Sequence, residues 1–168
     1  MQLKRTKPLP TLKQRIANRE ARIGILGLTP EGLTTAVRYS RAGFPVTCID
    51  LRDVKVERVR RGMSFTDIAT DMELLALVES GRIKATTNVR ASREIDFLIV
   101  FQDTPDVDVN ARGAEAAFEA VARWLKKGVV ICLGDDVEPQ PCYVNMRNIM
   151  DAFGYRYGED YLLGTFAR

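Results

Sequence analysis

Two glycines and a threonine near the N-terminus have the types and spacing of a phosphate-binding turn. Gly27 and Gly32 follow the apolar run Ile23–Leu26 and stand at the first and third glycine positions of a G-x-G-x-x-G pattern, whereas Thr29 takes the middle position. In that pattern a strand enters a tight turn whose backbone approaches a pyrophosphate at the start of a helix. The spacing therefore predicts a dinucleotide-type turn in which the middle glycine has been replaced.

The residues at the end of this turn favour a self-capped helix over phosphate binding. Thr29 adds a β-branched side chain where close backbone approach requires glycine, and Pro30 has no amide hydrogen to donate. Glu31 places a carboxylate in the first helical turn, where it suits the helix dipole and repels a pyrophosphate. These residue types also suit an N-cap, a first helical position and a first turn. We therefore expect a stable helix start here.

A second candidate position ends the next apolar run. Asp50 follows Cys48 and Ile49 and lies 18 residues after Gly32, close to the offset of roughly 20 residues at which an acid binds an adenosine ribose. Lys55 lies five residues further on, within reach of a phosphate or a ribose. The alternative, an ordinary aspartate in a turn at a strand end, stays open.

Acidic residues follow two further apolar runs. Asp103 comes after the fourth run, and Asp135 and Asp136 come after the fifth. If a parallel sheet brings them to one edge, they could bind Mg²⁺ or Ca²⁺, or one of them could act as a base. They could equally be helix caps and turn residues that face water. Because no metal-ligand spacing accompanies them, we predict no metal site and keep the three aspartates as a possible new site.

Composition limits the classes of function. The chain has 168 residues, of which 46% are hydrophobic and 28% charged, which is typical of one globular domain. A net charge of +3 is too small to indicate nucleic-acid binding. Apolar runs of membrane-spanning length and a signal peptide are both missing. Cys48 and Cys132 lie in apolar runs and are expected to be reduced core residues, so we expect a cytoplasmic protein with no membrane partner. The sequence contains no histidine, which removes the commonest general base and zinc ligand.

Strand and helix candidates alternate along the chain. The strand candidates are Arg22–Leu26, Val46–Ile49, Lys84–Thr86, Phe97–Phe101, Val129–Leu133 and Tyr161–Leu163. The helix candidates between them are Pro30–Ala42, Val54–Arg61, Met72–Ser80, Ala111–Lys127 and Pro139–Phe153. This alternation predicts a doubly wound, Rossmann-like and mostly parallel sheet of order 3-2-1-4-5-6, with helices on both faces. Residues 1–20 are expected to form a basic arm and a short helix, and residues 21–168 a single domain.

Segments spread over nearly the whole chain resemble one known family. The segments are Arg22–Leu28, Gly32–Leu33, Ala42–Asp50, Lys55–Gly62, Leu77–Thr87, Thr104–Pro105, Trp124–Gly128 and Gly158–Leu163. They are similar to the N-terminal NAD-binding domain of the UDP-glucose/GDP-mannose dehydrogenase family. The similarity is greatest to the branch that oxidises UDP-N-acetyl-hexosamines to uronic acids.

The resemblance implies an activity, a cofactor and a set of contacts. Family members oxidise the 6-hydroxyl of a nucleotide sugar in two NAD-dependent steps, in nucleotide-sugar metabolism and polysaccharide biosynthesis. By resemblance, Asp50 and Lys55 would contact NAD on its adenosine side, and Thr104 would belong to the cofactor site. Gly27, Thr29 and Gly32 would occupy the positions of the phosphate turn.

The departures from the family pattern fall on its chemistry. The V-P-T-P motif reads Gln102–Pro105, and the S-T-V-x-P-G-T motif reads Asp135–Pro141. The F-S-P-E-R motif reads Gly164–Arg168, with Ala167 in place of the catalytic glutamate. The family's catalytic lysine, cysteine and aspartate belong to regions beyond this chain. We therefore expect no catalytic residue here, and NAD binding that is weak or absent.

Three functions follow from these observations. The one we favour is a pseudoenzyme, a non-catalytic module that binds a protein partner, a second copy of itself or a ligand other than NAD, through an exposed apolar patch. The second is a subunit that still binds NAD or another nucleotide without chemistry, as Asp50 and Lys55 would allow. The third is a small enzyme with new carboxylate chemistry at Asp103, Asp135 and Asp136.

Overall fold

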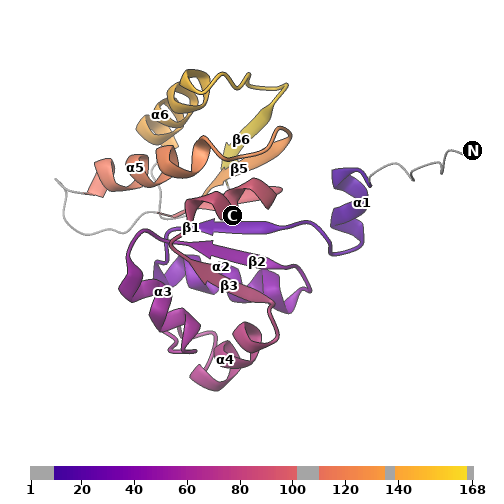
Figure 1. Ribbon diagram of the computed structural model, residues 1–168, viewed down its shortest axis with the longest axis vertical. Coiled ribbons are helices and arrows are strands. Elements are labelled where there is room, and N and C mark those ends of the chain that lie inside the picture. The colour runs from indigo at the N-terminus through magenta and orange to yellow at the C-terminus, as the bar shows by residue number, and fades with distance from the viewer. Residues whose placement is uncertain (1–9, 102–109, 135–138, 166–168) are drawn as a thin grey trace, which may run out of the picture.

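A six-stranded sheet forms the centre of the computed structural model, which describes residues 10–101, 110–134 and 139–165 (Figure 1). Its strands are β1 (Ile23–Leu26), β2 (Val46–Ile49), β3 (Ile83–Thr86), β4 (Phe97–Val100), β5 (Val129–Leu133) and β6 (Tyr161–Thr165). They run in the order β3-β2-β1-β4-β5-β6, and every neighbouring pair is parallel. The predicted Rossmann-like sheet and its strand order are confirmed.

Helices connect the strands and pack on the sheet. They are α1 (Leu12–Ala17), α2 (Pro30–Arg41), α3 (Asp53–Arg60), α4 (Asp71–Glu79), the 3₁₀ helix η1 (Val89–Glu94), α5 (Asn110–Ala122) and α6 (Pro139–Ala152). In Figure 1, α2, α3 and α4 lie with β1–β3 at one end of the molecule, whereas α5 and α6 lie with β5 and β6 at the other. In the described residues, no helix is long and apolar enough to cross a bilayer.

Helix α5 ends at Ala122, five residues before the predicted end at Lys127. The amides that follow it bond to carbonyls three residues back, which tightens the last turn. Lys126 and Lys127 lie beyond the helix and pair with the carboxylates of Asp96 and Asp160. The predicted end of α5 was wrong because these lysines form ion pairs in the turn that follows the helix. The short helix η1 was not predicted.

Burial differs between the two halves of the sheet. Strand β1 is buried at all of its positions, as expected for a parallel strand covered on both faces. In β5 and β6 burial alternates. The buried residues of these two strands join one core cluster with Phe118 of α5 and Met146 of α6. The alternate residues stay partly exposed, so α5 and α6 cover one face of β5 and β6 and leave the other face open.

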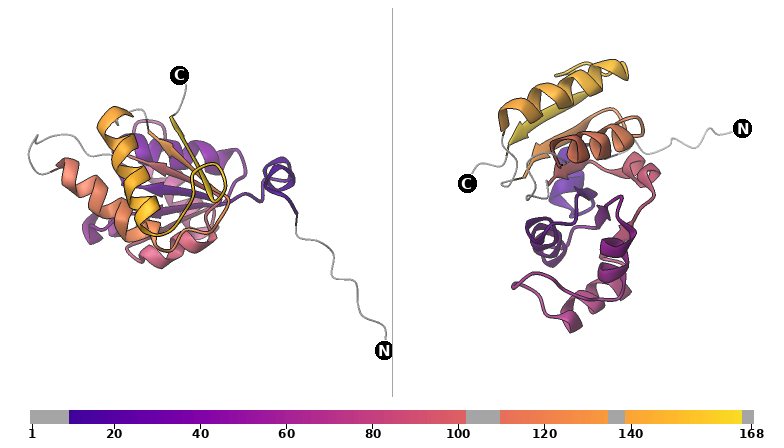
Figure 2. Two further views of the ribbon diagram at one scale, coloured as in Figure 1. Left: turned by 90° about the horizontal axis from the view of Figure 1, so that it is seen from above. Right: turned by 90° about the vertical axis from the view of Figure 1, so that its left-hand side faces the viewer.

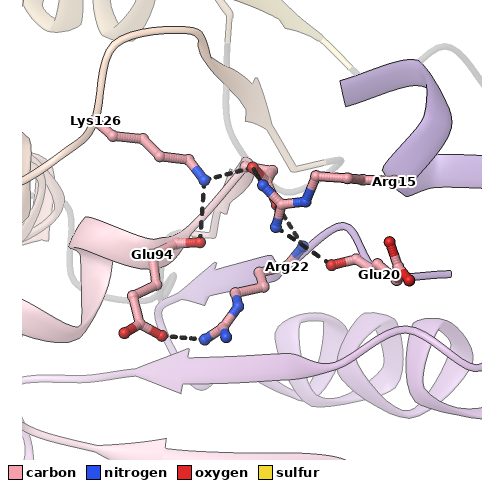
Figure 3. Close-up of polar contacts among 6 residues, drawn as sticks. Arg15, Glu20, Arg22, Glu94 and Lys126 are labelled. Atoms are coloured by element: carbon pink, nitrogen blue, oxygen red, sulfur yellow. Dashed lines mark hydrogen bonds and ion pairs between the residues drawn. The ribbon is translucent and has the colours of Figure 1, made fainter. Parts of the chain in front are cut away.

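A buried carboxylate ties α1 to the amino-terminal edge of the sheet. Asp96 precedes β4, is 3% exposed, and accepts hydrogen bonds from Arg15 Nη1 at 2.8 Å and Arg22 N at 2.7 Å. Lys126 pairs with the same carboxylate, and Figure 3 shows Arg15 and Lys126 converging from two sides. Figure 2 shows that α1 stands apart from the body of the domain. This cluster therefore holds an outlying helix at the edge opposite the carboxyl ends of the strands.

Candidate functional site

The turn after β1 and the first turn of α2 each contain a glycine that the fold itself requires. Gly27 has a φ of 97°, and a Cβ at this position would lie 2.5 Å from Phe101 O. A Cβ at Gly32 would lie 2.4 Å from Gly27 O, because α2 packs closely against the turn. Both positions exclude larger residues whether or not a ligand binds. Their presence therefore explains the turn and does not by itself indicate a cofactor.

Thr29 caps the helix that begins at this turn. Its Oγ1 accepts a hydrogen bond from Gly32 N at 2.9 Å, Pro30 is the first residue of α2, and Glu31 lies in the first turn. The predicted self-capped helix start is confirmed. A phosphate at a helix N-terminus uses free backbone amides. Here the amide of Gly32 is bonded to Thr29, and Pro30 has no amide hydrogen.

Asp50 lies at the carboxyl end of β2, next to the turn. Its Oδ2 accepts a hydrogen bond from Leu28 N at 2.7 Å, and its Oδ1 accepts one from Arg52 N at 2.9 Å. The Arg52 guanidinium adds a bond to each oxygen, Nε to Oδ1 at 2.9 Å and Nη2 to Oδ2 at 2.8 Å. Asp50 lies at the strand end where its spacing predicted it, whereas Arg52 was not predicted, because its one signal in the sequence is a cation two residues after the acid.

The environment of Asp50 favours its ionised form. Burial opposes the charge, but the hydrogen bonds from Arg52 and Leu28 outweigh it, so the pKa of Asp50 lies below its usual value. Burial also raises the pKa of the neighbouring Cys48 thiol to about 12, and the charge of Asp50 adds to this effect. At neutral pH the site therefore holds a carboxylate and an unreactive thiol.

Lys55 reaches the same turn from α3. Its Nζ donates a hydrogen bond to Leu28 O at 2.9 Å. Since Asp50 accepts from Leu28 N, the two residues predicted to contact an adenosine bind the backbone N–H and the backbone C=O of Leu28. The structure thus brings Asp50 and Lys55 together beside the turn after β1, where each side chain forms a hydrogen bond with the backbone of Leu28.

The remaining candidate residues lie outside the described part of the chain. These are Thr104, Asp103, Asp135 and Asp136, together with Ala167. The predicted cofactor contact at Thr104 and the possible new carboxylate site therefore stay predictions. Among the residues that the structure does describe, no three His, Cys, Asp or Glu side chains lie close enough to hold a metal ion.

The described side chains do not fit NAD as they stand. A carboxylate has about four acceptor positions, and the hydrogen bonds from Leu28 and Arg52 occupy four on Asp50. The helix start replaces one phosphate-binding amide with Pro30 and adds the carboxylate of Glu31. A ribose hydroxyl would have to displace one of the hydrogen bonds to Asp50. A pyrophosphate would have to lie against the negative charge of Glu31.

Two hollows adjoin on the side of the sheet that carries α2. The larger, of about 650 Å³, runs along α2 and is lined by polar and aromatic side chains, among them Thr34, Arg38 and Phe65. The smaller, of about 360 Å³, is apolar and is lined by Ile16, Ala21, Ile23, Tyr39, Phe44, Phe97, Ile99, Cys132 and Thr165. Tyr39 lines both hollows.

The smaller hollow belongs to a surface that we call the open sheet face. It consists of the partly exposed residues of β4, β5 and β6 on the side of α2, namely Phe97, Val130, Cys132 and Leu162. Leu162 is 51% exposed. No signal in the sequence identifies this face, because Phe97–Val100 and Val129–Leu133 are continuous apolar runs, the pattern typical of strands covered on both faces.

A model of one protein family matches most of the chain. It describes the "UDP-glucose/GDP-mannose dehydrogenase family, NAD binding domain" and matches residues 21–153. The UDP-N-acetyl-D-mannosamine dehydrogenase of Pyrococcus horikoshii is 24% identical over 143 residues, which are 83% of this chain and 34% of that protein. The enzyme of the same name from Salmonella typhi is 30% identical over 115 residues, 66% of this chain and 27% of that protein.

Solved structures of dehydrogenases share the fold. The Pyrococcus horikoshii enzyme superposes with a TM-score of 0.73 at 23% identity, over 88% of this chain and 36% of that one. An NDP-N-acetyl-D-galactosaminuronic acid dehydrogenase from Methanosarcina mazei gives a TM-score of 0.75 at 18% identity, over 96% and 38%. The chain spans about a third of the length of these relatives.

Proposed function

Because the chain belongs to the UDP-glucose/GDP-mannose dehydrogenase family and corresponds to its NAD binding domain, we propose that it works as a non-catalytic Rossmann module of that family. It acts by binding a protein partner, and its affinity for NAD is impaired. The partner that the open sheet face accommodates most simply is a second copy of this chain, since closed two-fold dimers are the commonest assemblies.

The open sheet face is the observation that carries this proposal. Parallel sheets are normally covered on both faces, yet β5 and β6 expose alternate side chains, and Leu162 is 51% exposed. The apolar hollow beside them reaches from Ile16 of α1 to Cys132 of β5. Contiguous apolar surface of this kind marks an interaction site. Docking of another protein would complete the second layer over this half of the sheet.

The altered first turn supports the second part of the proposal. The hydrogen bonds that a dinucleotide would accept and donate at the ends of β1 and β2 are made within the chain, by Thr29, Asp50 and Lys55. The helix start adds the carboxylate of Glu31 where a pyrophosphate would lie. The sheet of the family is therefore present, while Thr29, Asp50 and Lys55, at the positions that would face a ligand, stabilise the turn instead.

Self-association tests the proposal directly. We expect sedimentation velocity to show a monomer–dimer equilibrium for the unaltered protein, shifted to monomer by Leu162→Glu. The matched control is Val144→Glu on α6, because Val144 is 52% exposed and Leu162 is 51% exposed. A protein that stays monomeric at every concentration, or two variants that behave alike, would contradict the open sheet face as the dimer interface.

A nucleotide-binding subunit without chemistry is the second candidate. It is favoured by one observation, the placement of Asp50 at the carboxyl end of β2 with Lys55 beside it. NAD affinity in the unaltered protein would support this candidate over the first. The third function, new carboxylate chemistry, rests on Asp103, Asp135 and Asp136 and has no support among the described residues.

A further inference from the structure

The Asp50 carboxylate is held by two backbone amides, which the fold fixes in place, and by one side chain, which can move away. Two of its hydrogen bonds come from backbone amides, those of Leu28 and Arg52. The other two come from the Arg52 side chain, one to each oxygen. Asp50 is 4% exposed, whereas the side chain of Arg52 is 48% exposed and reaches the acid from solvent.

The geometry of the pair determines what competes with it. Arg52 lies two residues after Asp50 and is the N-cap residue of α3, where its side chain caps no helix amide. The guanidinium binds both carboxylate oxygens in the bidentate way that makes such pairs strong. A ribose hydroxyl is a neutral donor, so it would replace a hydrogen bond between two charged groups with one in which only the carboxylate is charged.

We propose that Arg52 closes the ribose position of this domain, by occupying the two acceptor positions of Asp50 that the 2′- and 3′-hydroxyls of an adenosine would otherwise use. The inference deepens the proposed loss of NAD affinity and rests on it, because it names the residue responsible on the ribose side. Thr29, Pro30 and Glu31 act separately, on the phosphate side of the turn.

Removal of the guanidinium should therefore open the position without rebuilding the turn. In Arg52→Ala both backbone bonds to Asp50 remain available, and one acceptor position on each oxygen becomes free. A suitable probe is adenosine, which carries the diol and has no phosphate for the altered helix start to reject. Its control is 2′,3′-dideoxyadenosine, which lacks both hydroxyls.

The experiment is a titration of each folded protein with both nucleosides, followed by NMR. We expect Arg52→Ala to bind adenosine at least ten-fold more tightly than the unaltered protein, with no gain for 2′,3′-dideoxyadenosine. Arg52→Gln should gain less, since its neutral amide still reaches the acid. The matched control is Arg61→Ala at the other end of α3, where the arginine side chain is 73% exposed and pairs with Glu57; this variant should show no gain.

The outcomes separate this inference from the proposed function. If Arg52→Ala and Arg52→Gln both fold and neither gains affinity, Arg52 does not close the position, and the proposed module is unaffected. An equal gain for the dideoxynucleoside would also overturn the inference, because the diol would not be involved. If the unaltered protein binds adenosine as tightly as Arg52→Ala through its diol, the proposed loss of NAD affinity fails as well.

Discussion

Gly27 and Gly32 are retained in a turn whose other polar groups bond within the chain. The close approaches of Phe101 O to the first and of Gly27 O to the second are made by protein atoms. Thr29 likewise caps α2. Asp50 links the end of β2 to the turn after β1 through its hydrogen bond from Leu28 N. Residue types that look like a ligand site can therefore persist because the fold requires them.

Gly32→Ala should destabilise the domain by about 1–3 kcal/mol, the usual cost of forcing an extra carbon into a packed site. The added Cβ would lie 2.4 Å from Gly27 O, a backbone atom that cannot move aside cheaply. Urea unfolding of both proteins measures the difference. Gly164→Ala on β6 is the control, because a Cβ there meets nothing within 4 Å. Equal effects at the two glycines would contradict this explanation of the turn.

Asp50→Asn should reduce the acid sensitivity of the fold. Because the pKa of Asp50 is lowered in the folded protein, its ionisation stabilises the fold above the ordinary value of about 4. That contribution is lost as pH falls through the lower folded value. The unfolding free energy of the unaltered protein should therefore fall more steeply below about pH 4 than that of the variant. Parallel pH profiles from urea titrations would rule out a stabilising role for this ionisation.

Helix α1 depends on one ion cluster for its position. It has six residues, none of them buried, so its own core contacts are few. Arg15 binds Asp96, which also accepts from the backbone of Arg22 and pairs with Lys126. The cluster joins α1, β1, β4 and the segment before β5, and it lies away from the candidate site.

Asp96→Asn should release α1 and cost about 1.5–3 kcal/mol, because the buried side chain would lose its charge-assisted hydrogen bonds to the partly exposed Arg15 and Lys126. Trypsin should then cleave near Arg15 and Arg19 faster, and urea should unfold the variant earlier. Glu94→Gln is the control, because its ion pair with Arg22 is exposed on both sides, and pairs of that kind contribute about 0–1 kcal/mol. Unchanged tryptic cleavage in Asp96→Asn would show that α1 is held by other contacts.

The whole domain is asymmetric in how its sheet is covered. Strands β1 to β3 carry α2, α3 and α4, while β5 and β6 carry α5 and α6 on one face (Figure 1). The opposite face of β5 and β6 is the surface to which we assign the partner. In relatives roughly three times as long, the same fold occurs within a larger chain.

Cys132 gives an independent readout of that surface. It lies on the open sheet face and is partly exposed, whereas Cys48 and Cys142 are buried. Burial raises the pKa of all three thiols, so accessibility decides their order of reaction, and Cys132 should be the first to be alkylated in the monomer. We expect its alkylation to slow as protein concentration rises, and Leu162→Glu to abolish that dependence. A rate independent of concentration in the unaltered protein would argue against self-association through this face.

The sequence predicted the strands, their order and the capped start of α2, because apolar periodicity, Pro30 and Thr29 report directly on local structure. It placed Asp50 at the correct strand end by spacing alone. It did not predict Arg52 closing over Asp50, because a side chain two residues away gives no periodic signal. It also missed the early end of α5, since the pairing of Lys126 with Asp96 depends on residues distant in the chain.

Calorimetric titration with NAD⁺ tests whether the altered helix start prevents cofactor binding, using the unaltered protein and the variant Thr29→Gly/Pro30→Tyr/Glu31→Val side by side. The proposed loss of NAD affinity predicts no measurable binding by the unaltered protein and a gain in affinity in the variant, because these residues cap the helix and oppose a pyrophosphate. Micromolar binding by the unaltered protein would contradict it and would identify the chain as a nucleotide-binding subunit.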